Sequence, residues 1–390
     1  MITHEHENEW GYSIKIQMEK MRMDIQKIAV LGAGNGGLAC SADLSLAGYK
    51  VNLFEFPKFK ANIEPILKRG GIEIVGQARE GFARLNKITT NIKEAIEDVD
   101  IILVVVPAFA HKFVAKVCSL YLQDGQIIVL NPGHTGGALE FAVTLQELGV
   151  KRDIKLAETM TLTYATRRVG PAKVEVFILV KKLLFAAFPG KDTRDVINVF
   201  KDLYPSVVPA ANVLETGLTN INAILHPPGM ILNAGWIEHS KGDFSFYTEG
   251  LTRSVGSVCE ALDEERLALM KTLGFRPLTL VEWYNMTGYT PLRNVSISDA
   301  LRASERQEKI KAPSSTKHRY ITEDVPYGLV PMASLGDVLS VSTPIMDSLI
   351  ALSSLINQAE YWSEGLTAKK LGIADLSSTD LNAVLYEGTR

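Results

Sequence analysis

The stretch from Lys27 to Gly37, KIAVLGAGNGG, places a short β-branched and aliphatic run directly before a glycine-rich turn. The next residues, LACSADLSLAG, have helical spacing as far as Gly48, and YKVNLFEF follows as a second β-patterned run. A strand, a turn, a helix and a second strand make a βαβ unit, in which the crossover is right-handed and the strands are parallel. The stretch therefore predicts an α/β fold that begins with a Rossmann domain.

The glycine-rich turn matches the G-x-G-x-x-G pattern of dinucleotide-binding loops. In that pattern one glycine makes the tight turn, one lets the backbone approach a pyrophosphate, and one lets the helix pack against the strand. Glu55 ends the second strand, where an acid accepts hydrogen bonds from an adenosine ribose, and this favours NAD. The nearby Lys58 and Lys60 leave NADP open as a cofactor. We expect the whole turn to bind the cofactor: Gly32, Ala33, Gly34, Asn35, Gly36 and Gly37.

Two further apolar runs, DIILVVVPAFAH and QIIVLNPGHTGG, are typical of strands buried in a parallel sheet. Open α/β sheets bind ligands at the carboxyl ends of their strands. His111 and His134 lie just beyond those ends, and each could contact a ligand, although a solvated loop histidine is the ordinary interpretation. The residues expected to line the cofactor cleft here are Pro107, Ala108, Asn131, Pro132 and Gly133.

The length of 390 residues predicts about two domains. Residues 1–23 are polar and without pattern, so we interpret them as a flexible N-terminal extension. Residues 24–210 hold the β-patterned segments and are expected to form the Rossmann domain. Two of these segments, residues 154–167 and 173–189, are each expected to form one strand. Helical patterns dominate residues 211–390, which predicts an all-α domain.

The composition excludes several classes of protein. A formal net charge of −3 gives no reason to expect a nucleic-acid partner or an anionic membrane surface. No apolar run is long enough for a membrane span, and the start of the chain lacks the apolar core of a signal peptide. The three cysteines have neither pair spacing nor companion metal ligands, so we expect no metal site and a reducing, cytoplasmic setting.

A histidine followed by two prolines stands inside the apolar run TNINAILHPPGMILNAG, residues 219–235. Proline removes a backbone donor and its ring strikes the carbonyl one turn back, so prolines seldom lie inside helices. We expect Pro227 and Pro228 to end a helix and to let His226 project into a cleft. The alternative is a core histidine that caps one helix before another starts, and this stretch alone leaves both interpretations open.

A set of motifs resembles the octopine/nopaline (opine) dehydrogenase family from about Lys27 to the end of the chain. These motifs are GAGNGG, VVVPAFAH, NPG, TNINAILHPPGMILNAG, YTEG and HRYITEDVPYGLVP, in that order. The resemblance implies a Rossmann domain, a helical domain and a substrate cleft between them. It also implies that His226 is the catalytic acid/base and that Arg319 and Asp324 orient the substrate and the histidine. An NAD(P)-dependent opine dehydrogenase, acting on the CH–NH group of donors, is the activity implied.

The chemistry of these residue types agrees with that assignment. Opine synthesis condenses the amine of an amino acid with a 2-oxo acid such as pyruvate, and NAD(P)H reduces the resulting imine to a secondary amine. Histidine moves protons near neutral pH, and a carboxylate such as Asp324 would fix its tautomer. An arginine such as Arg319 can hold a carboxylate by two parallel hydrogen bonds. Asn222, four residues before His226, and Tyr247 are further candidates for substrate binding, although ordinary helix packing explains both patterns equally well.

Two other functions fit parts of the sequence. A different two-domain dehydrogenase, acting on a hydroxy acid or a polyol phosphate, would carry a catalytic lysine in the helix that begins the second domain, and residues 219–235 contain none. A non-catalytic NAD-binding regulator would need the glycine turn but not His226, Arg319 and Asp324. The sequence does not identify the amino acid or the 2-oxo acid, and a homodimer is only the default expectation.

Overall fold

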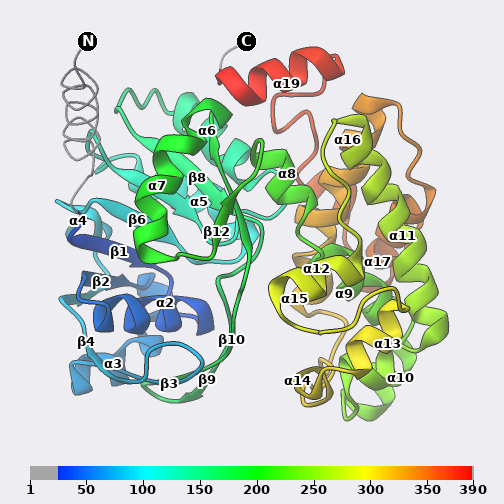
Figure 1. The fold of residues 1–390 in the computed structure, drawn as a ribbon, viewed down its shortest axis with the longest axis horizontal. Coiled ribbons are helices and arrows are strands. Elements are labelled where there is room, and N and C mark those ends of the chain that lie inside the picture. Colours follow the sequence, from blue (N-terminus) through cyan, green and yellow to red (C-terminus); the bar gives the residue numbers. More distant parts are fainter. Residues whose placement is uncertain (1–24, 389–390) are drawn as a thin grey trace, which may run out of the picture.

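The computed structural model describes residues 25–388, so the predicted N-terminal extension lies outside the described residues. Two β-sheets and their helices form one half of the molecule, and a group of helices forms the other half (Figure 1). The last strand ends at Pro209 and the next helix begins at Val213. The fold class predicted from the sequence, a Rossmann domain followed by an α-helical domain, is confirmed.

An eight-stranded sheet forms the core of the Rossmann domain. Six of its strands run parallel to one another, whereas β11 pairs antiparallel with β8 and β12 pairs parallel with β11, so these two run opposite to the rest. Most residues of the central strands are fully buried, as expected for a sheet with helices on both faces. In order across the sheet, the strands are β12 (Val207–Pro209), β11 (Leu183–Phe188), β8 (Lys155–Thr159), β7 (Ile127–Leu130), β6 (Ile101–Val104), β1 (Lys27–Leu31), β2 (Lys50–Phe54) and β5 (Lys87–Thr89).

The strand order reverses its direction at β1. The chain runs outward from β1 to β2 and β5, and then returns to add β6 and β7 on the other side of β1. Ile28 of β1 is in register with Val51 of β2 and with Ile101 of β6. A ligand crevice is expected at such a switch point, beyond the carboxyl ends of β1 and β6, because the connecting helices leave the sheet on opposite faces there.

A second, four-stranded sheet packs on helix α2 (Asn35–Leu46), which separates it from the large sheet (Figure 1). It consists of β4 (Gly81–Arg84), β3 (Gly71–Gly76), β10 (Lys173–Leu179) and β9 (Tyr164–Gly170). The predictions of one strand over residues 154–167 and one over 173–189 are wrong. Each run is divided between the two sheets, β8 and β11 entering the large one and β9 and β10 the small one. A continuous β pattern does not reveal where a chain changes sheets.

Helices complete both halves, and the chain finally returns to the Rossmann domain, where α19 packs against the short helix η3. The Rossmann half also contains η1 (Pro57–Asn62), α3 (Glu64–Arg69), α4 (Ile92–Ile96), η2 (Ala108–Ala110), α5 (His111–Cys118), α6 (Gly137–Glu147), η3 (Gly190–Asp192) and α7 (Thr193–Leu203). The helical half contains α8 (Val213–Leu218), α9 (Asn222–Ile231), α10 (Ala234–Ser240), η4 (Phe246–Gly250), α11 (Arg253–Thr272), α12 (Leu280–Thr287), α13 (Ile297–Arg302), α14 (Glu305–Glu308), α15 (Arg319–Thr322), η5 (Val325–Leu329), α16 (Val330–Leu339), α17 (Pro344–Asn357) and α18 (Tyr361–Glu364). The last helix, α19 (Ser378–Glu387), lies against the Rossmann half. Among residues 25–388, no helix has both the length and the apolar character needed to span a membrane.

Helix α9 carries His226 and passes straight through Pro227 and Pro228. The prediction that these prolines end the helix is therefore wrong. They remove two backbone donors, but Leu225 N–H donates to Ile221 before them and Leu232 N–H donates to Pro228 after them. Every residue from 223 to 231 is buried. Tertiary packing on all sides of α9 therefore outweighs the unfavourable helix propensity of the prolines.

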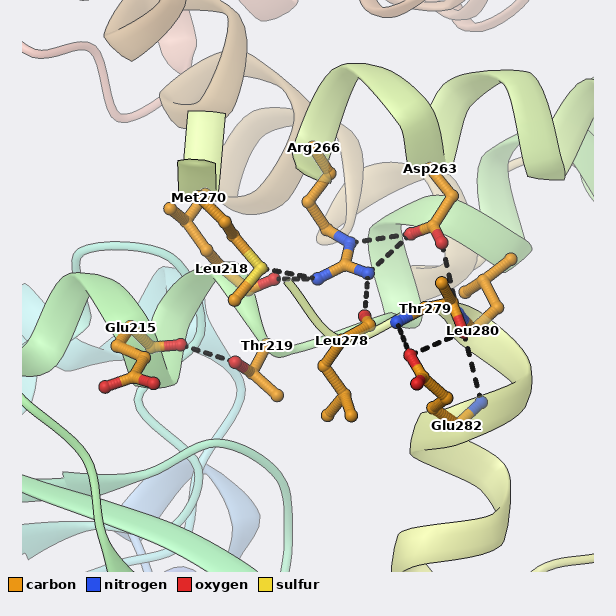
Figure 2. A network of polar contacts seen from close by, with 10 residues as sticks. All are labelled: Glu215, Leu218, Thr219, Asp263, Arg266, Met270, Leu278, Thr279, Leu280 and Glu282. Carbon is orange, nitrogen blue, oxygen red and sulfur yellow. Dashed lines mark hydrogen bonds and ion pairs between the residues drawn. The ribbon is translucent and has the colours of Figure 1, made fainter. Parts of the chain in front are cut away.

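A buried arginine joins the long helix α11 to the end of α8, the element that leads into α9 (Figure 2). The guanidinium of Arg266 donates from Nη1 to the carbonyl oxygen of Leu218 at 2.7 Å and from Nη2 to that of Leu278 at 2.6 Å. Its Nε donates to Asp263 Oδ1 at 2.8 Å, while the other carboxylate oxygen of Asp263 accepts from Leu280 N–H. Loss of any one of these contacts would leave part of a buried charge without a partner, which is unfavourable. The network therefore holds the end of α8, and with it the start of α9, in a fixed position relative to α11.

Candidate active site

His226 lies in the middle of α9, with both ring nitrogens in contact with polar side chains from other elements. Nδ1 is 2.7 Å from Oδ2 of Asp324, the residue that directly precedes η5. Nε2 is 2.8 Å from the hydroxyl oxygen of Tyr247, in the π-helical turn η4. All three residues are buried. The structure therefore brings together the histidine and the aspartate that the sequence analysis paired across 98 positions.

The two contacts define the protonation pattern of the ring. A carboxylate accepts hydrogen bonds only, so Asp324 holds the proton of His226 on Nδ1. Burial, with the neighbouring tyrosines Tyr320 and Tyr284, raises the pKa of Tyr247 well above its usual value, so this residue stays a phenol. Tyr247 can then donate to Nε2 when the imidazole is neutral and accept from it when it is protonated. Nε2 is consequently the nitrogen through which His226 can exchange a proton with a ligand.

Aromatic rings enclose the imidazole on its other sides. The ring of Tyr320 stacks on it with 3.7 Å between centroids and 12° between planes. Phe246 lies edge-on to the imidazole and is tilted relative to the ring of Tyr320. These rings exclude water from the His226–Asp324 pair, so the hydrogen bond between the two side chains is stronger than it would be in solvent.

Arg319 begins α15, one turn before the aspartate that holds His226. Its Nε is 3.0 Å from Oε2 of Glu323, and its side chain is 52% exposed. The other oxygen of Glu323 is 3.2 Å from Nε2 of His134, in the Rossmann domain. Glu323 thus fixes one end of the guanidinium, and the exposed remainder of Arg319 faces the cleft described next.

A cleft of about 1290 Å³ joins this cluster to the glycine turn. On the Rossmann side it begins at the turn and at the ends of β6 and β7, and on the helical side it reaches Asn222, His226, Arg319 and Tyr320. Of the predicted cofactor residues, it is lined by Ala33, Gly34, Asn35, Gly36, Pro107, Asn131 and Pro132. Its position matches the crevice expected at the switch point of the sheet.

The glycine turn has the shape that a dinucleotide needs. Gly32 has a φ of +108°, and a Cβ there would lie 2.4 Å from the carbonyl oxygen of Val105. A Cβ on Gly37 would lie 1.7 Å from the carbonyl oxygen of Gly32, so only glycine lets α2 approach the strand. Gly34 has open space where its side chain would be. The N-terminus of α2, which has no acidic residue in its first turn, therefore points its free amides at an open site for phosphate.

Glu55 lies beside this turn and is buried. Its Oε2 accepts from the backbone N–H of Ala33 at 3.3 Å and from the side-chain amide of Asn62 at 3.0 Å. Its Oε1 accepts from Phe56 N–H. The carboxylate thus holds the loop; it is not among the residues that line the cleft, and its contact with a ribose stays a prediction.

Several predicted residues lie behind the surface of the cleft. Gly32 and Gly37 contact one another, and a Cβ on Gly133 would meet the carboxylate of Glu158. Ala108 does not line the cleft, and its N–H donates to Glu323, which does. Tyr247 contacts His226 and is not among the residues that line the cleft, and its role in binding substrate stays a prediction. Asn222 lines the cleft on the same helix as His226, and it is half-buried.

Comparisons with known proteins identify the family. Residues 209–357 match the α-helical domain of NAD/NADP octopine/nopaline dehydrogenase, and residues 27–140 match the N-terminus of NAD-dependent glycerol-3-phosphate dehydrogenase. An opine dehydrogenase from Arthrobacter sp. (strain 1C) is 36% identical over 358 residues, which cover 92% of this chain and 98% of that protein. The chain belongs to the opine dehydrogenase family. It is therefore an oxidoreductase that uses NAD(P) and acts on CH–NH groups, as the sequence motifs predicted.

More distant members of the opine dehydrogenase family agree in length and fold. An opine dehydrogenase from Haliotis discus hannai is 24% identical and matches 91% of this chain and 95% of its own. Octopine dehydrogenase, solved in complex with NADH and agmatine, superposes with a TM-score of 0.75 at 20% identity over 94% of this chain and 98% of its own. Yersinopine dehydrogenase with bound NADP+ gives a TM-score of 0.69 at 16% identity over 93% and 98% of the two chains.

The opine dehydrogenase motifs did not reveal all the polar residues at this site. The expectation that His111 and His134 are solvated is wrong, because both are buried under the ends of β6 and β7. Burial, together with the neighbouring His134, lowers the pKa of His111 to about 3. Glu323 and Tyr320 were missed, although both stand inside the quoted HRYITED segment. Only the pairing of elements far apart in the sequence gives these two residues their partners.

Proposed function

We propose that this opine dehydrogenase joins the amine of an amino acid to a 2-oxo acid, with pyruvate as the favoured oxo acid. The observation that supports the proposal is the buried His226–Asp324 pair, which opens on the same cleft as the glycine turn. A group that moves protons next to a bound nicotinamide is what the reduction of a carbon–nitrogen double bond requires. When bound, the reduced nicotinamide supplies the hydride.

His226 is assigned the proton transfers. During condensation the amine attacks the carbonyl carbon, and the carbonyl oxygen must receive protons before it leaves as water. Protonated His226 can supply a proton from Nε2, while Asp324 stabilises the imidazolium through Nδ1. Tyr247 holds Nε2 by a hydrogen bond until a ligand replaces or shares that contact.

Arg319 is assigned the carboxylate of the oxo acid. Its Nε is already engaged by Glu323, which leaves the two terminal nitrogens to form a bidentate pair. Two parallel hydrogen bonds fix both the position and the orientation of the oxo acid, and therefore of its carbonyl carbon. A lysine ammonium cannot form such a bidentate pair, which accounts for an arginine at this position. Asn222, one helical turn before His226, can hydrogen-bond either the substrate or the amide of the cofactor.

NAD is the proposed cofactor because the carboxylate of Glu55 lies beside the turn and would repel the 2′-phosphate of NADP. The neighbouring Arg168, which donates to the carbonyl oxygen of Asn62, is the cation in the best position to offset that repulsion. A cytoplasmic location is supported by the three cysteines, all buried and unpaired. A homodimer remains the expected oligomeric state.

The test is the oxidation of NADH with pyruvate and each common amino acid in turn, repeated with NADPH and with other 2-oxo acids. We expect turnover only when both an amine and an oxo acid are present, and a higher kcat/KM with NADH than with NADPH. Replacement of His226 by Asn should abolish turnover while the dissociation constant of NADH changes little. Turnover with an oxo acid alone would instead indicate a hydroxy-acid dehydrogenase.

A further inference from the structure

Glu323 is a fully buried carboxylate that touches both domains. Its Oε1 accepts from the backbone N–H of Ala108 at 2.8 Å and lies 3.2 Å from Nε2 of His134. Its Oε2 lies 3.0 Å from Nε of Arg319. Ala108 follows strand β6 and His134 follows strand β7, so one side chain from the helical domain is held by the carboxyl ends of two Rossmann strands.

The environment keeps this carboxylate charged. Burial on its own would raise the pKa of Glu323, but the opposing effects of His134, Arg319 and the N–H of Ala108 prevail and lower it to about 2. His111, packed behind the same strand ends, is held neutral by burial and adds no competing charge. The carboxylate accepts one hydrogen bond, from Ala108 N–H, and lies within ion-pair distance of His134 and Arg319, so three contacts on its two oxygens hold it in place.

Glu323 and Asp324 are consecutive, and each controls a different part of the site. Glu323 binds the strand ends that line the cofactor cleft, and Asp324 binds His226. The backbone between them therefore transmits the position of the Rossmann strands to the imidazole. Because Glu323 also engages Nε of Arg319, it sets the direction in which the terminal nitrogens of that arginine point.

We propose that Glu323 is a positioning residue, joined to His134, that aligns Arg319 with the end of the cofactor cleft for binding of the 2-oxo acid. This inference rests on the proposed function, since it assigns Arg319 to the carboxylate of the oxo acid. Its effect should therefore be seen in the binding of the oxo acid and not in the binding of NADH.

Glu158 provides a matched control. It is likewise fully buried and spans the two domains, accepting from Ala138 N–H at 2.9 Å and contacting Oγ1 of Thr216 at 2.5 Å. It has no cationic partner among the described residues, and burial raises its pKa to about 8. A carboxylate that only holds the domains together should resemble Glu158 in its mutational effects.

The experiment compares Glu323→Gln with Glu158→Gln and the wild type. The amide of Glu323→Gln keeps an acceptor for Ala108 N–H but loses the charge that holds His134 and Arg319. We expect the KM for the oxo acid, and its dissociation constant from the NADH complex measured by NADH fluorescence, to rise about 10- to 100-fold. The dissociation constant of NADH should stay within about twofold. Glu158→Gln should leave both oxo-acid constants unchanged.

His134→Asn tests the same link from the Rossmann side. Asparagine tolerates the positive φ of 57° at this position, so the backbone is expected to persist. We expect a smaller rise in the same oxo-acid constants, and the effects of the two substitutions should not add when they are combined. This variant also carries the test if Glu323→Gln does not fold.

Unchanged oxo-acid constants in Glu323→Gln, or equal changes in Glu323→Gln and Glu158→Gln, would overturn this inference alone. If the wild type neither binds pyruvate nor oxidises NADH with any amine and oxo acid, the proposed function fails and this inference fails with it. The two failures are therefore distinguishable from the wild-type measurement.

Discussion

Replacing Asp324 with Asn removes one charge from the His226 pair while keeping the size of the side chain. The carboxylate and the imidazolium have their charge centres about 4 Å apart, and at an effective dielectric constant of about 20 their attraction is about 4 kcal/mol. Both side chains are at least nine-tenths buried, so little of that energy is lost to solvent. A loss of about 4 kcal/mol in stabilising the imidazolium corresponds to a decrease in rate of about 1000-fold. An asparagine amide can also donate to Nδ1 and so favour the wrong tautomer, which acts in the same direction.

The assay is single-turnover oxidation of NADH with pyruvate and a saturating amino acid, measured for the wild type and for Asp324→Asn. We expect the rate constant to fall about 1000-fold while the dissociation constant of NADH is unchanged. Asp195→Asn, on the exposed face of α7, is the control for the loss of one negative charge and should behave as the wild type. A decrease of less than tenfold would refute the reasoning, because it would mean that His226 works without its carboxylate.

Three other substitutions test separate parts of the structure. In Glu158→Gln an amide replaces an acid whose pKa is raised from 4.5 to about 8 by folding. The wild type should therefore lose stability relative to the variant as pH rises from about 4.5 to about 8, by at most about 5 kcal/mol. Melting temperatures of both proteins across that pH range test this, and parallel curves would count against it. Gly37→Ala puts a Cβ 1.7 Å from the carbonyl oxygen of Gly32, so the affinity for NADH should fall at least about tenfold in a fluorescence titration, whereas normal affinity would show that the turn can move aside. Tyr247→Phe removes the hydroxyl that contacts Nε2 of His226, and kcat should fall about tenfold with little change in melting temperature; an unchanged kcat would assign Tyr247 to packing alone.

The sequence predicted the features that depend on local pattern. Gly32 and Gly37 are recognisable because a Cβ at either position would clash in the turn that joins a buried strand to α2, and that constraint lies within a few residues. His226 and Asp324 were paired from a family resemblance, and the structure places their side chains in contact. No pattern within either segment measures the distance between them.

Long-range packing determined what the sequence did not show. Pro227 and Pro228 remain helical because the residues around them in α9 are buried by other elements. The local preference of proline does not reveal that burial. Glu323 looks like an ordinary helix-terminal acid until β6 and β7 bring Ala108 and His134 to it. The division of residues 154–167 between two sheets has the same origin, since the second sheet exists only in the folded chain.

The central claim is that this chain forms a carbon–nitrogen bond between an amino acid and a 2-oxo acid, and the direct measurement is mass spectrometry of the product. The wild-type enzyme would be incubated with NADH, pyruvate and an amino acid labelled with ¹⁵N at its amine. We predict a labelled secondary amine with the mass of the two substrates combined, less one water and plus two hydrogens. NADH oxidation that yields only an unlabelled hydroxy acid would contradict the account.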